Sequence, residues 1–341
     1  MVSTVDDTKR LLIATKLADM KELQNLLINN EQQLIQDCTD DDICDRLQHM
    51  LEDDRKNIGV IDTVIVQYGV KGEPKETTQK MIEQVQKLME GSELTLFEKV
   101  QEHELLKHKQ TMAGLLVHKA AQVVGADIEA AITPLNTVNF ENRAHQEQLK
   151  GILEILGVRE LTGKEAKQGL WARVQDAVAA LTGVVGSVVT RTDDEMSIRQ
   201  LLLMDHSKVD ILFMEIFNAN EPEKIQEYFG QLYKDIKVHG TAEEQVLYPA
   251  VRPYYEHTQE IYAQTDEVME MLDEIKPLNF SSPEFKAKIE QLRTAVRTHI
   301  NQEENDIFPK LRDNFSHEQQ KQIATEFKTA KSKLQEQMTA S

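Results

Sequence analysis

Apolar residues recur every three or four positions along most of the chain, which is the period of an amphipathic helix. No stretch shows the sustained alternation of a β-strand, so the pattern predicts an all-α fold. Glycine and proline divide the pattern into segments. In the first half, helices are predicted at residues 6–36, 41–69, 75–90, 93–125 and 127–156. In the second half, they are predicted at residues 197–219, 223–249, 254–276 and 283–309, with a polar fifth from residue 316.

The two sets of helices predict two bundles, over residues 1–158 and 197–341, joined by a linker over residues 159–196. Within the linker, residues 169–189 are apolar and rich in small side chains, and they include Trp171. This stretch predicts an amphipathic helix that packs against one or both bundles. The alternative is a helix that binds a membrane surface, a protein partner or a second copy of the chain.

The net charge and the two cysteines indicate which binding partners and which cellular compartment to expect. The net charge is −19, which repels phosphates, so we expect no nucleic acid partner. No window approaches twenty uncharged apolar residues, so we expect no membrane span. The N-terminus lacks the pattern of a signal peptide, which predicts a cytoplasmic protein. Cys38 and Cys44 fit no zinc or redox motif and are predicted to be small buried thiols in a reducing compartment.

One sequence motif, the repeated phrase, occurs twice, sixty residues apart. Residues 239–249 and 299–309 share the pattern H-x-x-x-E-E-x-x-[LI]-[YF]-P. A histidine and a glutamate four residues apart lie on one face of a helix. Imidazoles and carboxylates that converge from two helices can bind a transition metal. The phrase therefore predicts half of a metal site.

The ligand candidates coincide with the apolar stripes that should face the bundle core. His206, for example, follows Leu202 by four residues and precedes Val209 by three. Glu244 and Glu304 fall off these stripes and are expected on the flank. A buried carboxylate needs a partner, which either mutual hydrogen bonding or a metal supplies. Ligands without cysteine suit iron, manganese or zinc. The predicted ligands are His206, His239, Glu243, His299 and Glu303.

At these residues, over about 198–312, the chain resembles the hemerythrin-type HHE cation-binding family. The resemblance implies a four-helix bundle with a non-heme di-iron centre. The sequence departs from the family pattern on the third helix, where Thr265 stands at the expected histidine position. Tyr262, one turn away, is a candidate substitute. The departure implies either an open ligand position on one of two irons or a site for a single iron.

The first bundle offers a weaker candidate for a second metal site. Glu104 with His108 and Glu141 with His145 are two E-x-x-x-H pairs on consecutive predicted helices. His108 is predicted to face inward by the apolar stripe Phe97, Leu105, Met112 and Leu115. His145 is predicted to face inward by the stripe Leu135, Val138, Leu149 and Ile152. Residues 98–157 also resemble the later helices of ferritin-like bundles. The ferritin-like E-x-x-H signature is missing, so we expect a ferritin-like scaffold that has lost or altered its metal.

These features favour a non-heme iron protein that interacts with O2 or a related small molecule, in sensing, in oxygen or iron handling, or in stress defence. Two alternatives stay open. One is a di-iron oxidase or oxygenase, because an open position on an iron can activate O2. The other is a structural or interaction protein with a degenerate site. No catalytic residue is predicted.

Overall fold

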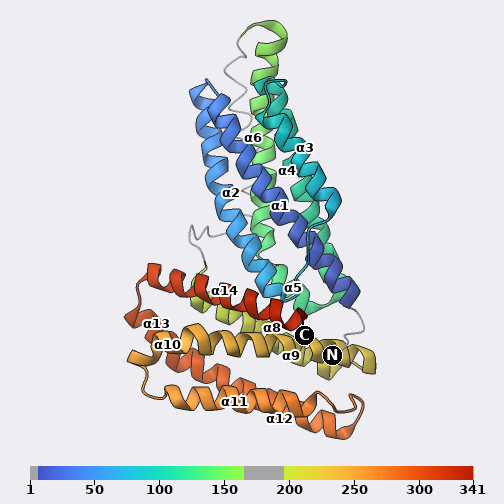
Figure 1. Ribbon diagram of the computed structural model, residues 1–341, viewed down its shortest axis with the longest axis vertical. Coiled ribbons are helices and arrows are strands. Elements are labelled where there is room, and N and C mark those ends of the chain that lie inside the picture. Colours follow the sequence, from blue (N-terminus) through green and yellow to red (C-terminus); the bar gives the residue numbers. More distant parts are fainter. Residues whose placement is uncertain (1–6, 165–195, 341) are drawn as a thin grey trace.

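The computed structural model describes residues 7–164 and 196–340, and within these ranges every regular element is a helix (Figure 1). The predicted all-α fold is confirmed. The helix predicted at residues 169–189, with Trp171, lies outside the described residues. The first six helices are α1 (Asp7–Asp37), α2 (Asp41–Tyr68), α3 (Glu76–Glu90), α4 (Leu96–Val124), α5 (Ala126–Ile132) and α6 (Leu135–Thr162).

Helices α1, α2, α4 and α6 form a long bundle, with α3 against α1 and the short α5 at one end. Local sequence sets their ends. Asp40 accepts a hydrogen bond from the Ile43 amide at the start of α2, and Gly69, at φ 77°, ends that helix in the left-handed region that glycine tolerates. Thr95 and Glu98 form a reciprocal capping box at the start of α4.

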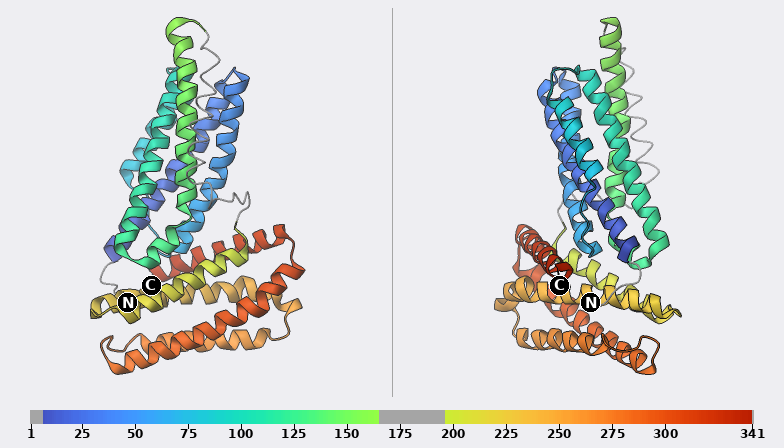
Figure 2. Two further views of the ribbon diagram at one scale, coloured as in Figure 1. Left: turned by 180° about the vertical axis from the view of Figure 1, so that it is seen from behind. Right: turned by 45° about the vertical axis from the view of Figure 1, so that its right-hand side comes forward.

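The second set of helices lies across one end of the first bundle (Figures 1 and 2). Its four long helices are α8 (Ile198–Asn218), α9 (Pro222–Ala242), α11 (Thr258–Ile275) and α12 (Pro283–Gln302), and the last helix, α14 (His317–Ala340), packs over α8 and α9. The short segments α10 (Tyr248–Val251), η2 (Arg252–Tyr254) and α13 (Phe308–Asn314) complete it. Ser197 and Gln200 cap α8.

Buried polar contacts join the two bundles. Arg10 of α1 donates to Asp127 at 2.8 Å and to Glu227 of α9 at 3.3 Å, and all three side chains are at most 1% exposed. Lys208 of α8 donates to the carbonyl oxygens of Gln67 and Tyr68, at the end of α2, at 2.8 and 3.1 Å. Because buried charges need their partners, these contacts favour one relative placement of the bundles.

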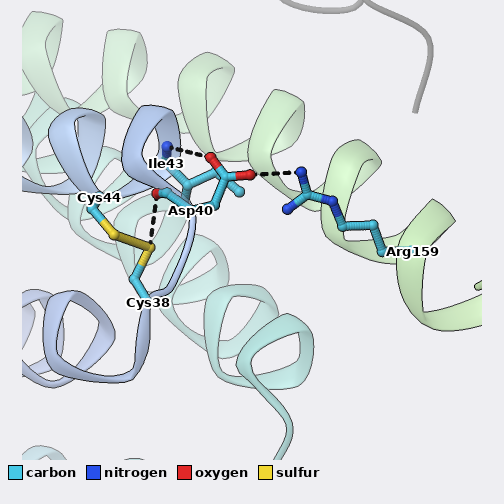
Figure 3. Close-up of a disulfide and its surroundings, with 5 residues drawn as sticks. All are labelled: Cys38, Asp40, Ile43, Cys44 and Arg159. Carbon is cyan, nitrogen blue, oxygen red and sulfur yellow. Dashed lines mark hydrogen bonds and ion pairs between the residues drawn. A yellow bond between two sulfur atoms is a disulfide. The ribbon is translucent and has the colours of Figure 1, made fainter. Parts of the chain in front are cut away.

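Cys38 and Cys44 are joined in a disulfide (Figure 3). The prediction of free buried thiols is therefore wrong, and both residues are only half-buried. The turn between α1 and α2, which Asp40 caps, brings their Cα atoms to 5.9 Å, within the range that a disulfide needs. The same Asp40 pairs with Arg159 of α6 at 2.6 Å, so the turn is also tied to the neighbouring helix.

None of the helices in residues 7–164 and 196–340 combines the length and the hydropathy needed to cross a bilayer.

Candidate metal centre

Each copy of the repeated phrase contains one π-helical turn, η1 (Glu243–Leu247) and η3 (Glu303–Ile307). The amide of Tyr248 donates to the Glu243 carbonyl, and that of Phe308 donates to the Glu303 carbonyl, five residues back. The proline that follows each turn has no N–H, so the α-helical ladder is already interrupted there. The wider turn brings the residue after it back over the glutamate, and the Tyr248 hydroxyl lies 3.1 Å from Glu243 Oε2.

Four of the predicted ligands converge in the core of the second bundle. One ligand atom from each of His206, His239, Glu243 and Glu303 lies within 4.8 Å of the other three. His206 Nε2 is 3.2 Å from Glu303 Oε2, and His239 Nε2 is 2.9 Å from Glu243 Oε1. Both glutamates are fully buried and both histidines are nearly so. Four separate segments, α8, α9, η1 and η3, supply these groups.

Outer carboxylates hold both histidines by their other ring nitrogen. His239 Nδ1 is 2.9 Å from Asp205, and His206 Nδ1 is 2.9 Å from Glu304. In this arrangement each Nε2 points inward, which is how histidine ligands are commonly oriented at metals. The prediction that Glu304 lies on the flank agrees with this structure, although its contact with His206 could not be predicted from helical spacing.

The fifth predicted ligand, His299, lies on the other side of the same glutamates, where a tyrosine hydroxyl takes the central position. The hydroxyl of Tyr248 is 3.0 Å from Glu303 Oε1 and 3.3 Å from both His299 Nε2 and Thr265 Oγ1. The Tyr248 phenol thus takes part of the space beside Thr265, which was expected to be an open ligand position, and a small cavity remains there. Tyr262, the expected substitute, instead donates to the backbone carbonyl of Glu244 at 3.3 Å and does not enter this group.

Charge pairing sets the protonation of the metal-free centre. Burial alone would lower the pKa of His239, but Glu243 and Asp205 raise it well above its ordinary value. Burial would raise the pKa of Glu243, and His239 and His299 hold it well below its usual range. Burial, with Glu243 and Glu303, raises the pKa of the Tyr248 phenol well above its normal value. A metal ion would therefore displace protons from the imidazoles when it binds.

The inward-facing atoms fit a metal better than they fit one another. His206 Nε2, His239 Nε2, Glu243 Oε1 and Glu303 Oε2 are all buried, and none has a partner in hydrogen-bond geometry, despite the short distances between them. Buried polar atoms of this kind are costly unless a further group satisfies them. Two imidazoles and two carboxylates that point at a common position match the donors of a divalent transition metal.

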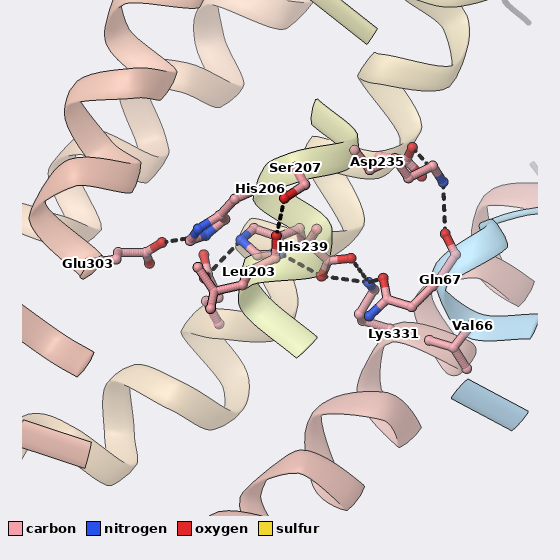
Figure 4. A network of polar contacts seen from close by, with 12 residues as sticks. Val66, Gln67, Leu203, His206, Ser207, Asp235, His239, Glu303 and Lys331 are labelled. Carbon is pink, nitrogen blue, oxygen red and sulfur yellow. Dashed lines mark hydrogen bonds and ion pairs between the residues drawn. The ribbon is translucent and has the colours of Figure 1, made fainter. Parts of the chain in front are cut away.

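A polar network connects this centre to the first bundle (Figure 4). Asp205, which holds His239, accepts hydrogen bonds from Lys331 of α14 at 2.6 and 2.7 Å. Lys331 also donates to the Gln67 side chain of α2 at 3.3 Å. Burial would raise the pKa of Asp205, and Lys331 and His239 lower it well below its ordinary value. Three links thus connect a candidate metal ligand to the neighbouring bundle.

A small cavity of about 30 Å³ adjoins the centre, bordered by His239, Glu243, Thr265 and His299 and by apolar side chains that include Val268 and Val296. A water molecule needs roughly 10–15 Å³ of such space. The cavity therefore suits one or two water-sized molecules and excludes a nucleotide.

The first bundle does not form the second site that was predicted. Leu105 and Met112, taken to mark the inner face of α4, are 59% and 51% exposed, and His108 is exposed with them. Glu104 and His108 contact Gln146 near the surface, at 3.1 and 3.2 Å, and Glu141 is half-buried. Of the four predicted residues, only His145 is buried. The prediction failed because Lys99, His103, Lys107 and Gln110 share the buried face of α4 with apolar side chains such as Val100 and Leu106.

Comparison with known proteins supports the family suggested by the sequence. Residues 197–311 match the hemerythrin HHE cation binding domain. A protein of Nostoc sp. named "DNA nickase" is 59% identical over 342 residues, which span 99% of this chain and 97% of the relative. This chain carries a hemerythrin HHE domain at residues 197–311 and belongs to the same family as the Nostoc protein. An uncharacterized hemerythrin-like protein of Schizosaccharomyces pombe is 24% identical over 139 residues, covering 39% of this chain and 68% of that protein.

No solved structure gives a significant match. The ferritin-like resemblance of the first bundle is not shown by these comparisons and stays a prediction. The match to a cation binding domain supports cation binding by this chain. The matched residues belong to the second bundle.

The prediction that nucleic acid is not a partner is contradicted by the Nostoc relative, whose name states an action on DNA. The prediction rested on the net charge of −19, which is a sum over the whole chain. Phosphate binding depends on a local group of cations, and a metal ion can bridge acidic side chains to phosphate oxygens. Net charge was therefore the wrong quantity from which to exclude DNA.

Three residues of the centre were not identified from the sequence. Tyr248 occupies the [YF] position of the repeated phrase, so the repeat itself carried a signal for it. Asp205 directly precedes His206, and its carboxylate could have been proposed as an outer partner. Lys331 lies in α14, outside residues 197–311, and nothing in its local sequence indicates its role.

Proposed function

We propose that this chain is a metal-dependent DNA nickase whose metal is held at the centre formed by His206, His239, Glu243 and Glu303. The observation that carries the proposal is the identity of 59% with the relative named "DNA nickase", which extends over both bundles rather than the HHE domain alone. The converging imidazole and carboxylate atoms support the metal requirement.

Iron is the metal we propose, with manganese or zinc as alternatives that the same donors accept. When bound, the metal would supply Lewis acidity or redox chemistry. Asp205 and Glu304 would keep the two histidines aimed inward, and Glu243 and Glu303 would neutralise the charge of the ion. Tyr248 would donate its single hydroxyl hydrogen to the far oxygen of Glu243 or of Glu303, which lie 3.1 and 3.0 Å away.

The burial of the centre supports a second candidate, in which the metal interacts with O2 or a related small molecule. A cavity of about 30 Å³ suits a diatomic molecule and excludes a DNA strand. Sensing, oxygen or iron handling, and stress defence all fit such a centre. In this case the centre would control nicking, or supply the oxidant for it, without direct contact with the phosphodiester.

A plasmid-nicking assay tests the proposal. Purified protein is stripped of metal, reloaded with Fe²⁺, Mn²⁺, Zn²⁺ or no metal, and incubated with supercoiled plasmid in air and under argon. We expect open circles only with metal, and a sharp loss of nicking in Glu243→Gln while Glu244→Gln keeps it. Nicking that survives both metal removal and Glu243→Gln would refute the proposal.

The ends of the broken strand separate the two modes of cleavage. Nicks that DNA ligase seals carry a 3′ hydroxyl and a 5′ phosphate and indicate hydrolysis. Nicks that ligase cannot seal, formed in air but not under argon, indicate an O2-dependent reaction.

A further inference from the structure

In the middle of the first bundle, the ammonium of one lysine contacts groups from three other helices. Lys107 of α4 contacts Asp54 of α2, lies 3.1 Å from Glu31 of α1 and lies 3.1 Å from His145 Nδ1 of α6. Lys107, Glu31 and Asp54 are completely buried. An ammonium group has three hydrogens, and here two carboxylates and one imidazole nitrogen lie around it. The contacts therefore join all four long helices at one point.

The three groups around the ammonium are also residue types that bind metals. One ligand atom from each of Glu31, Asp54 and His145 lies within 4.8 Å of the other two. His103 adds a second imidazole, with Nε2 at 3.2 Å from Glu31. Glu31 Oε2 and His103 Nδ1 are buried without hydrogen-bond partners. This is a second convergent set of carboxylates and imidazoles, in the bundle for which no metal site is assigned.

One feature distinguishes this set from the centre in the HHE domain. There, the ligand atoms face one another with no lysine or arginine side chain among them, whereas here a lysine ammonium contacts all three ligand groups. Two buried carboxylates require a compensating positive charge. The Lys107 ammonium, which contacts both Asp54 and Glu31, supplies that charge. A divalent ion at the same position would be repelled by that charge.

We propose that the Lys107 ammonium takes the place of a metal ion in the first bundle, where it closes a latent site for a divalent first-row cation formed by Glu31, Asp54 and His145. The native chain then holds metal only in its HHE domain. Removal of the ammonium leaves two uncompensated buried carboxylates beside an imidazole, and such a set binds Co²⁺ or Zn²⁺.

The test uses the full chain with Co²⁺ as the probe. Wild type, Lys107→Met and Lys109→Met are titrated, and bound cobalt is measured by mass spectrometry and by its visible absorption. Methionine keeps most of the length of lysine without the charge, and Lys109 is an exposed control on the same helix. We expect Lys107→Met to bind one more equivalent than wild type, and Lys109→Met to match wild type. Bound Co²⁺ should raise the melting temperature of Lys107→Met.

A second variant covers the case in which Lys107→Met needs metal to fold. Lys107→Met with Asp54→Asn removes both the ammonium and one ligand, and should show no extra cobalt and no rise in melting temperature. A Lys107→Met chain that gains no cobalt, whether or not it folds, overturns the proposal. So does a His239→Ala chain, with Lys107 intact, that binds cobalt at the first bundle and loses it on Glu31→Gln.

Discussion

Replacement of Asp205 by asparagine tests how the outer network supports the metal centre. The carboxylate is 6% exposed, accepts two hydrogen bonds from Lys331 at 2.6 and 2.7 Å, and lies 2.9 Å from His239 Nδ1. Asparagine keeps the shape of the side chain and removes its charge. His239 then loses the group that orients it and raises its basicity, while Lys331 is left buried without its main partner.

Two losses follow from these contacts. Loss of an outer partner of a ligand histidine weakens metal binding about 10- to 100-fold, and this corresponds to about 1.4–2.7 kcal/mol. Removal of one partner from a buried ion pair lowers the free energy of unfolding by about 3–5 kcal/mol. A double variant, Asp205→Asn with Lys331→Met, also removes the ammonium that Asp205→Asn leaves unpaired. It should recover much of the free energy of unfolding but none of the metal affinity.

Competition with a chromophoric chelator measures the affinity for Co²⁺, and urea unfolding of the metal-free protein measures stability. Asp210→Asn is the matched control, because Asp210 lies on the same helix and is 45% exposed. An Asp205→Asn variant that binds metal within threefold of wild type, or an Asp210→Asn variant that binds equally weakly, would rule out this role for Asp205.

Two further predictions concern the phenol and pH. Tyr248→Phe removes the hydroxyl between Glu243 and Glu303 and should raise the bound metal from one to two equivalents, by mass spectrometry; unchanged stoichiometry would contradict this. Burial would lower the pKa of His206, His239 and His299, but neighbouring carboxylates raise it above the ordinary value. The protonated histidines therefore stabilise the folded protein fully below pH 6.5, and this stabilisation is lost as pH rises through their pKa values in the folded state. Urea unfolding should show the metal-free protein less stable at pH 9 than at pH 6, and metal should reverse this trend, because binding requires unprotonated imidazoles; equal slopes with and without metal would count against the assignment.

The ligand candidates of the second bundle could be identified from the sequence. His239 with Glu243, and His299 with Glu303, are fixed by helical spacing alone, and their apolar neighbours indicate which face is buried. Tyr248 could not be placed in this way. In a regular α-helix a residue five positions after Glu243 points about 140° away from it. The π-helical turn, which periodicity does not reveal, is what turns the phenol back to the centre.

The first bundle shows the opposite case, in which the hydrophobic pattern pointed to the wrong face. The inner face of α4 carries Lys107 and His103, whereas Leu105 is exposed. Charged groups can line a core when their partners come from other helices, here Glu31 and Asp54, and a single-helix pattern contains no information about those partners. The same limit applies to Lys331 and Gln67, which lie 264 residues apart in the sequence.

The most direct test of the account is plasmid nicking measured on the same samples as bound metal. Protein is loaded with increasing amounts of iron, and nicking rate is plotted against iron per chain for wild type, Glu303→Gln and Glu244→Gln. We expect a rate proportional to bound iron in wild type and Glu244→Gln, with both the rate and the bound iron lost in Glu303→Gln. A nicking rate independent of bound iron, or unchanged in Glu303→Gln, would contradict it.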